Sequence, residues 1–171
     1  QPVGRGIGPA LEARDVLAVL CREPDAPADL RERALHLAAR VLELSPDVKA
    51  GSGARLAAQL LDSGKAWTKF LAICEAQGGF REPAIAPLTR AVASQHTGEC
   101  VAIDNRRIAQ VAKLAGAPQS RTAGVDLHVR LGQRVERGAP LYTIHGEAPG
   151  ELDYALAFAN HHPDILRVEP R

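Results

Sequence analysis

Apolar residues in the first 79 positions of the chain recur at the spacing of an α-helix. Four such segments, separated by breaks rich in proline, glycine and aspartate, cover residues 9–23, 30–45, 55–64 and 65–79. Pro9 suits the first helical turn, where its missing N–H has no intrahelical partner. Asp29 is predicted to cap the second helix, while Gly64 and Gly78–Gly79 are predicted to end the third and fourth. The second helix carries its apolar residues on one face, at Leu30, Ala34, Leu37, Val41 and Leu44.

The pattern changes between residues 80 and 90. Residues 89–94 and 98–104 alternate apolar and polar positions as short strands do, with a turn between them. A helix is predicted over residues 105–117, two strands within 124–147, a further helix over 150–162 and a last strand over 165–170. This succession predicts an α+β chain, with a helical part over residues 1–84 and a small mixed domain over 85–171.

Composition and charge narrow the class of protein. The 171 residues are 46% hydrophobic and 24% charged, with a formal net charge of +1. This balance is typical of a globular protein and gives no basic patch for nucleic acid. No apolar run approaches the roughly 20 residues of a membrane span, and no secretory signal is visible. Cys21, Cys74 and Cys100 lie far apart without a metal-binding or disulfide pattern, which favours reduced thiols in a cytoplasmic protein.

The opening segment QPVGRGIGPALEARD places Gly4, Gly6 and Gly8 just before a helix. Backbone N–H groups at such a position can bind an anion, although the spacing matches neither a dinucleotide fingerprint nor a phosphate loop. A tight turn that carries the helix is the simpler interpretation. Asp15 is close enough in sequence to complete a cation site with loop carbonyls. The chain also lacks methionine and opens inside what reads as a strand-to-helix loop, so we expect it to be the carboxy-terminal piece of a longer protein.

The segment VRLGQRVERGAPLYTIHGE has the rhythm of barrel-sandwich folds, which include domains that carry biotin or lipoate. Such carriers need an exposed lysine at the hairpin tip, and GQRVERG has none. The sequence therefore favours the fold without the prosthetic group. His128 and His145 lie on the two predicted strands of this segment and could face each other, with ordinary packed or solvated positions as the default.

Three stretches, in order, resemble one family. QPVGRGIGPALEARDVL is similar to the QP[LIV]GxxxGxALE segment of thymidine and pyrimidine-nucleoside phosphorylases, SGKAWTKFLAICEAQGG to their xGKAxxxFxxxxxxQGG helix, and AGVDLHVRLGQRVERGAPLYTIHGE to their GxxLHxxxGDxVxxGxPLxTI region. The residues of the first and third stretches most resemble the branch that includes AMP phosphorylases and bacterial thymidine phosphorylase homologues. The resemblance implies the helical tail of the family's central α/β domain, then a barrel-sandwich (hammerhead-like) carboxy-terminal domain.

The resemblance also implies a reaction. Phosphate attacks the anomeric carbon of thymidine, releasing thymine and 2-deoxyribose 1-phosphate, in pyrimidine nucleoside salvage. The family's phosphate loop, KxSxGGxGD, is absent from these 171 residues. The one S-x-x-x-K string, Ser45 to Lys49 (SPDVK), lies in a predicted loop, whereas the family's base-binding motif lies on a helix. We therefore expect the catalytic residues upstream of residue 1 and an inactive isolated chain. The longer protein is expected to be a cytoplasmic homodimer that uses phosphate as co-substrate and no other cofactor, except a potassium ion in several members.

By the same resemblance, the candidate ion ligands are the carbonyls of Val3 and Gly6 and the side chain of Asp15, where the family has Glu. The AMP phosphorylase branch need not use the ion. In that case the opening glycine loop only reverses the chain direction beside the cleft. Two alternatives for the function stay open. One is an AMP phosphorylase, which yields adenine and ribose 1,5-bisphosphate, and the other is a catalytically silent barrel-sandwich scaffold.

Overall fold

The computed structural model describes residues 2–170, which divide into two compact units. The first unit joins residues 1–14 to residues 83–171, and the second comprises residues 15–82. Helix α1 (Pro9–Cys21) begins in the first unit and continues into the second. The chain thus leaves the first unit after Arg14 and returns to it at Pro83.

The second unit is helical, as the apolar period predicts. It holds most of α1 together with α2 (Ala28–Leu42), α3 (Gly53–Asp62) and α4 (Lys65–Ala76). Helix α3 packs against α2 and α4. Helix α2 begins at Ala28, whereas the predicted helix began at residue 30. Asp29 therefore lies in the first turn, and Pro27 occupies the N-cap position. An aromatic cluster joins Trp67 to Phe70 and Phe80, with ring centroids 5.7 and 5.8 Å apart.

The first unit contains a four-stranded antiparallel sheet in the order β1-β4-β6-β2. These strands are β1 (Gly6–Ile7), β4 (Gly124–Leu127), β6 (Pro140–Gly146) and β2 (Leu88–Ala93). A second antiparallel sheet has the order β5-β3-β7, with β3 (Gly98–Ile103), β5 (Arg134–Val135) and β7 (Leu166–Glu169). The predicted strands at β2 and β3 are therefore confirmed, but they belong to different sheets.

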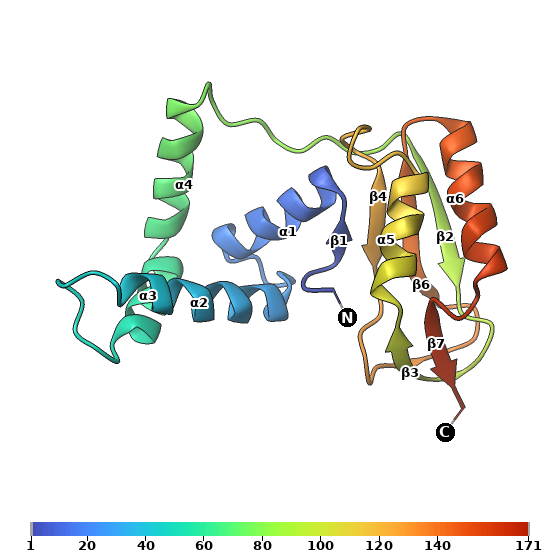
Figure 1. Ribbon diagram of the computed structural model, residues 1–171, viewed down its shortest axis with the longest axis horizontal. Helices are drawn as coiled ribbons and strands as arrows, with labels where there is room; N and C mark the ends of the chain where they lie inside the picture. The colour runs from blue at the N-terminus through green and yellow to red at the C-terminus, as the bar shows by residue number, and fades with distance from the viewer. Residues whose placement is uncertain (1, 171) are drawn as a thin grey trace. The chain divides into compact units, whose positions relative to one another are not determined.

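Two helices cover one face of the four-stranded sheet (Figure 1). Helix α5 (Asn105–Leu114) packs on β4, and α6 (Pro149–His161) packs on β6 and β2 and against α5. Asp104 caps α5, because its Oδ1 accepts the N–H groups of Arg106 and Arg107 at 3.0 Å. The fully buried side chains of this core are large and mainly aliphatic: Ile108, Val111, Val125, Tyr142, Ile144, Leu152 and Ile165.

The fold is thus of mixed α/β class, as predicted. In the described residues, however, its strands form two separate antiparallel sheets, whereas the prediction was a barrel-sandwich domain. The physical reason lies at the ends of the strands. Strand β2 stays paired with β6 across a register shift at Val92–Ala93 and ends there. The next strand, β3, pairs with β7 and β5 instead of closing onto β2.

Candidate functional site

The opening glycines pack helix α1 directly onto the sheet. Gly6 lies in β1 opposite Asp126 of β4. A Cβ atom added at Gly6 would lie 2.6 Å from the carbonyl oxygen of Leu11 and 2.7 Å from its Cβ. Real Cβ atoms essentially never lie this close to another heavy atom, so glycine is required where β1 approaches the first turn of α1. The loop therefore turns the chain and brings the first turns of α1 onto the sheet.

The N-terminus of α1 carries a carboxylate of its own. The Gly8 N–H donates to Oε1 of Glu12 over 3.0 Å, while the Glu12 N–H donates to the Gly8 carbonyl over 2.9 Å. This reciprocal pair satisfies one of the amides that a helix leaves open at its start. It also places a negative charge at the positive end of the helix dipole. The geometry supports a capped turn at this position in preference to a phosphate cradle.

The three residues proposed as cation ligands lie in different settings. Val3 is 50% exposed, Gly6 is buried in β1, and Asp15 is only 5% exposed within α1. The Arg5 carbonyl accepts the Leu127 N–H at 2.9 Å, so the neighbouring Gly6 carbonyl points away from β4. Gly6 and Asp15 both make polar interactions already. Residues 2–170 hold no group of three or more His, Cys, Asp or Glu side chains arranged as metal ligands. A potassium ion at these residues stays a prediction.

The strand register brings two histidines and a carboxylate to one face of the sheet. Asp126 lies opposite Thr143, and His145 lies opposite Gly124, so these side chains share the face that α1 approaches. His128 follows β4 on the same face, and its Nε2 lies 2.7 Å from Oγ1 of Thr143. The two histidines were predicted as candidates from the sequence, whereas Asp126 and Thr143 were not. The period of two along both strands was the signal that could have found them.

His145 is the titratable group that this setting changes most clearly. Burial lowers its pKa below the ordinary histidine range, and the charges of Arg14 and His128 lower it further. The Asp126 carboxylate acts in the opposite direction and raises the pKa. His145 is therefore mainly neutral at neutral pH, surrounded by both signs of charge.

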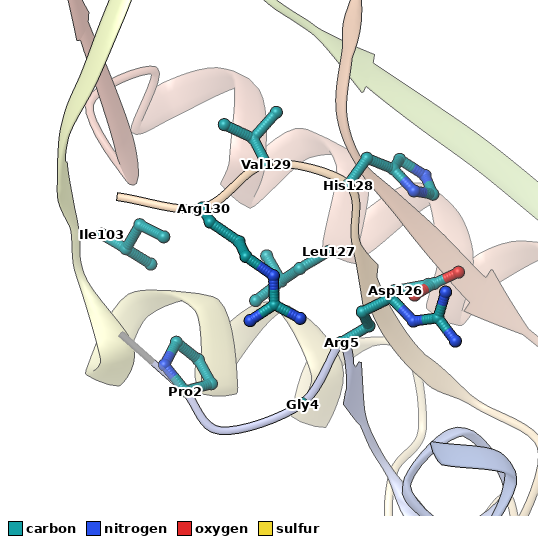
Figure 2. A pocket seen from close by; sticks show the side chains of 9 residues that line it. All are labelled: Pro2, Gly4, Arg5, Ile103, Asp126, Leu127, His128, Val129 and Arg130. Carbon is teal, nitrogen blue, oxygen red and sulfur yellow. The ribbon is translucent and has the colours of Figure 1, made fainter. Parts of the chain in front are cut away.

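A pocket of about 220 Å³ lies at the end of β4 beside the opening loop. Its wall is formed by Pro2 and Gly4 of the loop, Ile103 at the end of β3, and the segment 126–130. Figure 2 shows the Arg130 guanidinium pointing into this pocket between Pro2 and Leu127, with Arg5 on the side of Asp126. The pocket thus combines two guanidinium groups with one carboxylate. This arrangement can hold polar groups in place, but it does not contain the phosphate loop or base-binding motif expected upstream.

No helix among residues 2–170 has the length and apolar character needed to cross a lipid bilayer. The three cysteines are free thiols, exposed at Cys21, half-buried at Cys74 and buried at Cys100.

With this geometry in view, residues 100–165 match the model of the pyrimidine nucleoside phosphorylase C-terminal domain. These residues run from within β3 through α5, β4, β5, β6 and α6 to the residue before β7, and so include Asp126 and both histidines. The chain therefore contains a carboxy-terminal domain of the pyrimidine nucleoside phosphorylase family.

Relatives match over almost the whole chain. A protein of Hahella chejuensis named putative thymidine phosphorylase is 57% identical over 169 residues, which is 99% of this chain and 34% of the relative. A protein of Acidovorax sp. named putative thymidine phosphorylase 2 is 57% identical over 98% of this chain and 33% of its own length. One from Ralstonia nicotianae, named putative thymidine phosphorylase, is 58% identical over 96% of this chain and 32% of its own. The chain spans about a third of the length of these curated relatives.

Proposed function

We propose that this chain is part of a thymidine phosphorylase, a pentosyltransferase of pyrimidine nucleoside salvage. The observation that carries the proposal is the identity of 57% over 99% of the chain to a relative named putative thymidine phosphorylase. In the proposed reaction an oxygen of inorganic phosphate forms a bond to the anomeric carbon, and the bond from that carbon to the base nitrogen breaks. The base departs with the bonding electrons and takes up a proton, and 2-deoxyribose 1-phosphate remains.

The described residues support a structural role for this chain within that enzyme. They form a buried aliphatic core and a polar sheet face. The family's phosphate loop is absent from the sequence, and the one S-x-x-x-K string, at residues 45–49, lies in a loop instead of a helix. We propose that residues 1–84 complete the central α/β domain and that residues 85–171 form the carboxy-terminal domain, which acts as a wall across the cleft. The change of compact unit between Glu82 and Pro83 supports this division, although residues 1–14 pack with the later unit.

The setting proposed for the enzyme is a cytoplasmic homodimer with phosphate as co-substrate. A potassium ion held by the Val3 and Gly6 carbonyls and the Asp15 side chain is part of the proposal. A chelator-free comparison of potassium and sodium buffers tests it, because a specific site raises the unfolding temperature in potassium alone.

Release of free base tests the reaction. The longest natural polypeptide that contains this chain is incubated with thymidine, uridine or AMP, each with and without phosphate. The proposal predicts phosphate-dependent release of thymine from thymidine, and no release by residues 1–171 alone. Release of adenine from AMP in place of thymine would assign the AMP phosphorylase reaction. Absence of release from all three substrates would favour the scaffold alternative.

A further inference from the structure

A cavity of about 400 Å³ opens between the two sheets of the first unit. Its walls come from β2 and β7, the edge strands of their sheets, and from β6 and the carboxy-terminal half of α6. Most of the wall is aliphatic, formed by Val92, Leu141, Leu156, Ile165, Leu166 and Val168. The volume lies within the range of small-molecule sites, about 300–1,000 Å³. The rest of the lining includes polar side chains, namely Ser94, Gln95, His96, Tyr142, Asn160, Asp164 and Arg167.

Tyr142 supplies a polar group inside this apolar wall. Its side chain is 2% exposed, and its hydroxyl makes no hydrogen bond to any described residue. Buried phenol groups nearly always have a hydrogen-bond partner. No described side-chain oxygen or nitrogen is both sealed from solvent and without a partner. Because Tyr142 lines the cavity, its hydroxyl is available there to water or to a bound ligand.

The charged groups of the wall already have partners within the protein. Asp164 accepts a hydrogen bond from Nη1 of Arg107 at 2.8 Å, and Nε of Arg167 lies 3.1 Å from Oε1 of Glu169. The Ser94 hydroxyl donates to the His96 carbonyl at 2.7 Å. A charged ligand would have to break one of these exposed ion pairs to find a counter-charge, and its contact with the aliphatic part of the wall would be unfavourable. The cavity therefore suits a neutral molecule.

We propose that this cavity binds a neutral, mainly apolar ring compound whose hydrogen-bonding group pairs with the Tyr142 hydroxyl. A ring with one polar group suits a mainly aliphatic wall that contains a single tyrosine hydroxyl. A rigid ring also loses less conformational entropy on binding than a flexible chain of the same size. Phenols and nucleobases share this chemistry, and the site does not depend on the proposed phosphorolysis.

Titration of the full chain with four probes tests the site, followed by the backbone amide signals in two-dimensional NMR. The probes are p-cresol, thymine, toluene and benzoate. The site predicts shifts at the cavity residues with p-cresol or thymine, weaker binding of toluene, and none of benzoate. Binding by thymine alone identifies a nucleobase site, and binding by p-cresol alone identifies a phenol site.

Two substitutions distinguish the contribution of the Tyr142 hydroxyl to binding from the contribution of the cavity volume. Tyr142→Phe removes one hydrogen bond and is expected to weaken binding of the polar probe about fivefold while leaving toluene unchanged. Ala93→Leu, at an exposed position of the wall, narrows the cavity and is expected to abolish binding of all probes. Tyr154→Phe is the matched control, because Tyr154 is 73% exposed and does not line the cavity.

Three results would overturn the proposal. The first is the absence of shifts at the cavity residues with both p-cresol and thymine. The second is benzoate binding as strong as that of p-cresol, which would contradict a neutral site. The third is equal weakening of toluene and the polar probe in Tyr142→Phe, which would show that the hydroxyl contributes no specific contact.

Discussion

The Nη2 atom of Arg14 donates a hydrogen bond to the Pro83 carbonyl over 3.2 Å, joining residues 69 positions apart in the sequence. Arg14 is the last residue before the chain leaves the first unit, and Pro83 is the residue at which it returns. The same guanidinium lowers the pKa of His145. The Arg14 side chain thus contacts the residue at which the chain returns to the first unit, and its charge also acts on His145 of the sheet.

Substitution of Arg14 is predicted to change the titration of His145. Arg14→Gln removes a positive charge near the imidazole, so the pKa of His145 should rise. Asp126→Asn removes the carboxylate that favours the imidazolium, so the pKa should fall. Histidine ring signals followed by NMR across pH 4–9 measure both shifts, with the exposed Arg55→Gln as the control. Shifts of the same sign in both variants would contradict this assignment of charges.

The lowered pKa of His145 also predicts how stability depends on pH. The unfolded histidine titrates near about 6.5, above the folded value, so the unfolded state binds the proton more strongly. The contribution of His145 to the free energy of unfolding should therefore be fully present above about pH 6.5 and be lost as the pH falls through that value towards the folded pKa. Urea unfolding at several pH values measures this, and His145→Gln should show a smaller slope. An unchanged slope in that variant would contradict the prediction.

The contact between Gly6 and α1 predicts a steric penalty. Gly6→Ala places a methyl group against the Leu11 backbone and should destabilise the first unit by about 1–3 kcal/mol. Gly150→Ala is the matched control, because a Cβ there meets no atom within 4 Å and position 150 lies in α6. Alanine at that position should be neutral or stabilising by up to about 1 kcal/mol. Chemical denaturation measures both, and equal stability of the two variants would show that α1 does not pack against β1 this closely.

Truncation of an apolar side chain should lower the free energy of unfolding by different amounts in the two units. Ile144→Ala removes a fully buried side chain and should destabilise the first unit by about 2–5 kcal/mol. Leu44→Ala truncates a side chain that is 83% exposed and should change stability by less than about 0.5 kcal/mol. Denaturation monitored separately at the Tyr signals of the first unit and at Trp67 of the second distinguishes the two effects. A large loss in Leu44→Ala would mean that the leucine is covered.

The elements with a strong period could be predicted from the sequence. All four helices of the first half, helices α5 and α6, and the pairing of β4 with β6 follow from spacing, glycines and proline. The two-residue strands β1 and β5 were missed because two residues show no alternation. The second helix shows the opposite limit. Its apolar side chains were predicted to lie on one face. Leu37, Val41 and Leu44 are nevertheless 51%, 66% and 83% exposed, so the helical period does not by itself indicate burial.

The candidate site could be predicted only in part, because its contacts are not local. The two histidines were visible in the sequence, but the partnership of His128 with Thr143 needs the register between two strands separated by a loop. Arg14 approaches His145 from a helix more than a hundred positions earlier, which no local pattern indicates. The role of Glu12 at the start of α1 could have been predicted from the sequence, because a Glu in the first turn of a helix can accept a hydrogen bond from a backbone N–H just before that turn.

The product of thymidine breakdown tests the central proposal most directly. Phosphorus NMR of the natural polypeptide containing this chain, incubated with thymidine and phosphate, distinguishes a sugar phosphate from free phosphate. Phosphorolysis predicts one equivalent of 2-deoxyribose 1-phosphate for each thymine released. Thymine accompanied by free 2-deoxyribose, with the phosphate signal unchanged, would show hydrolysis by water and contradict the proposed phosphorolysis.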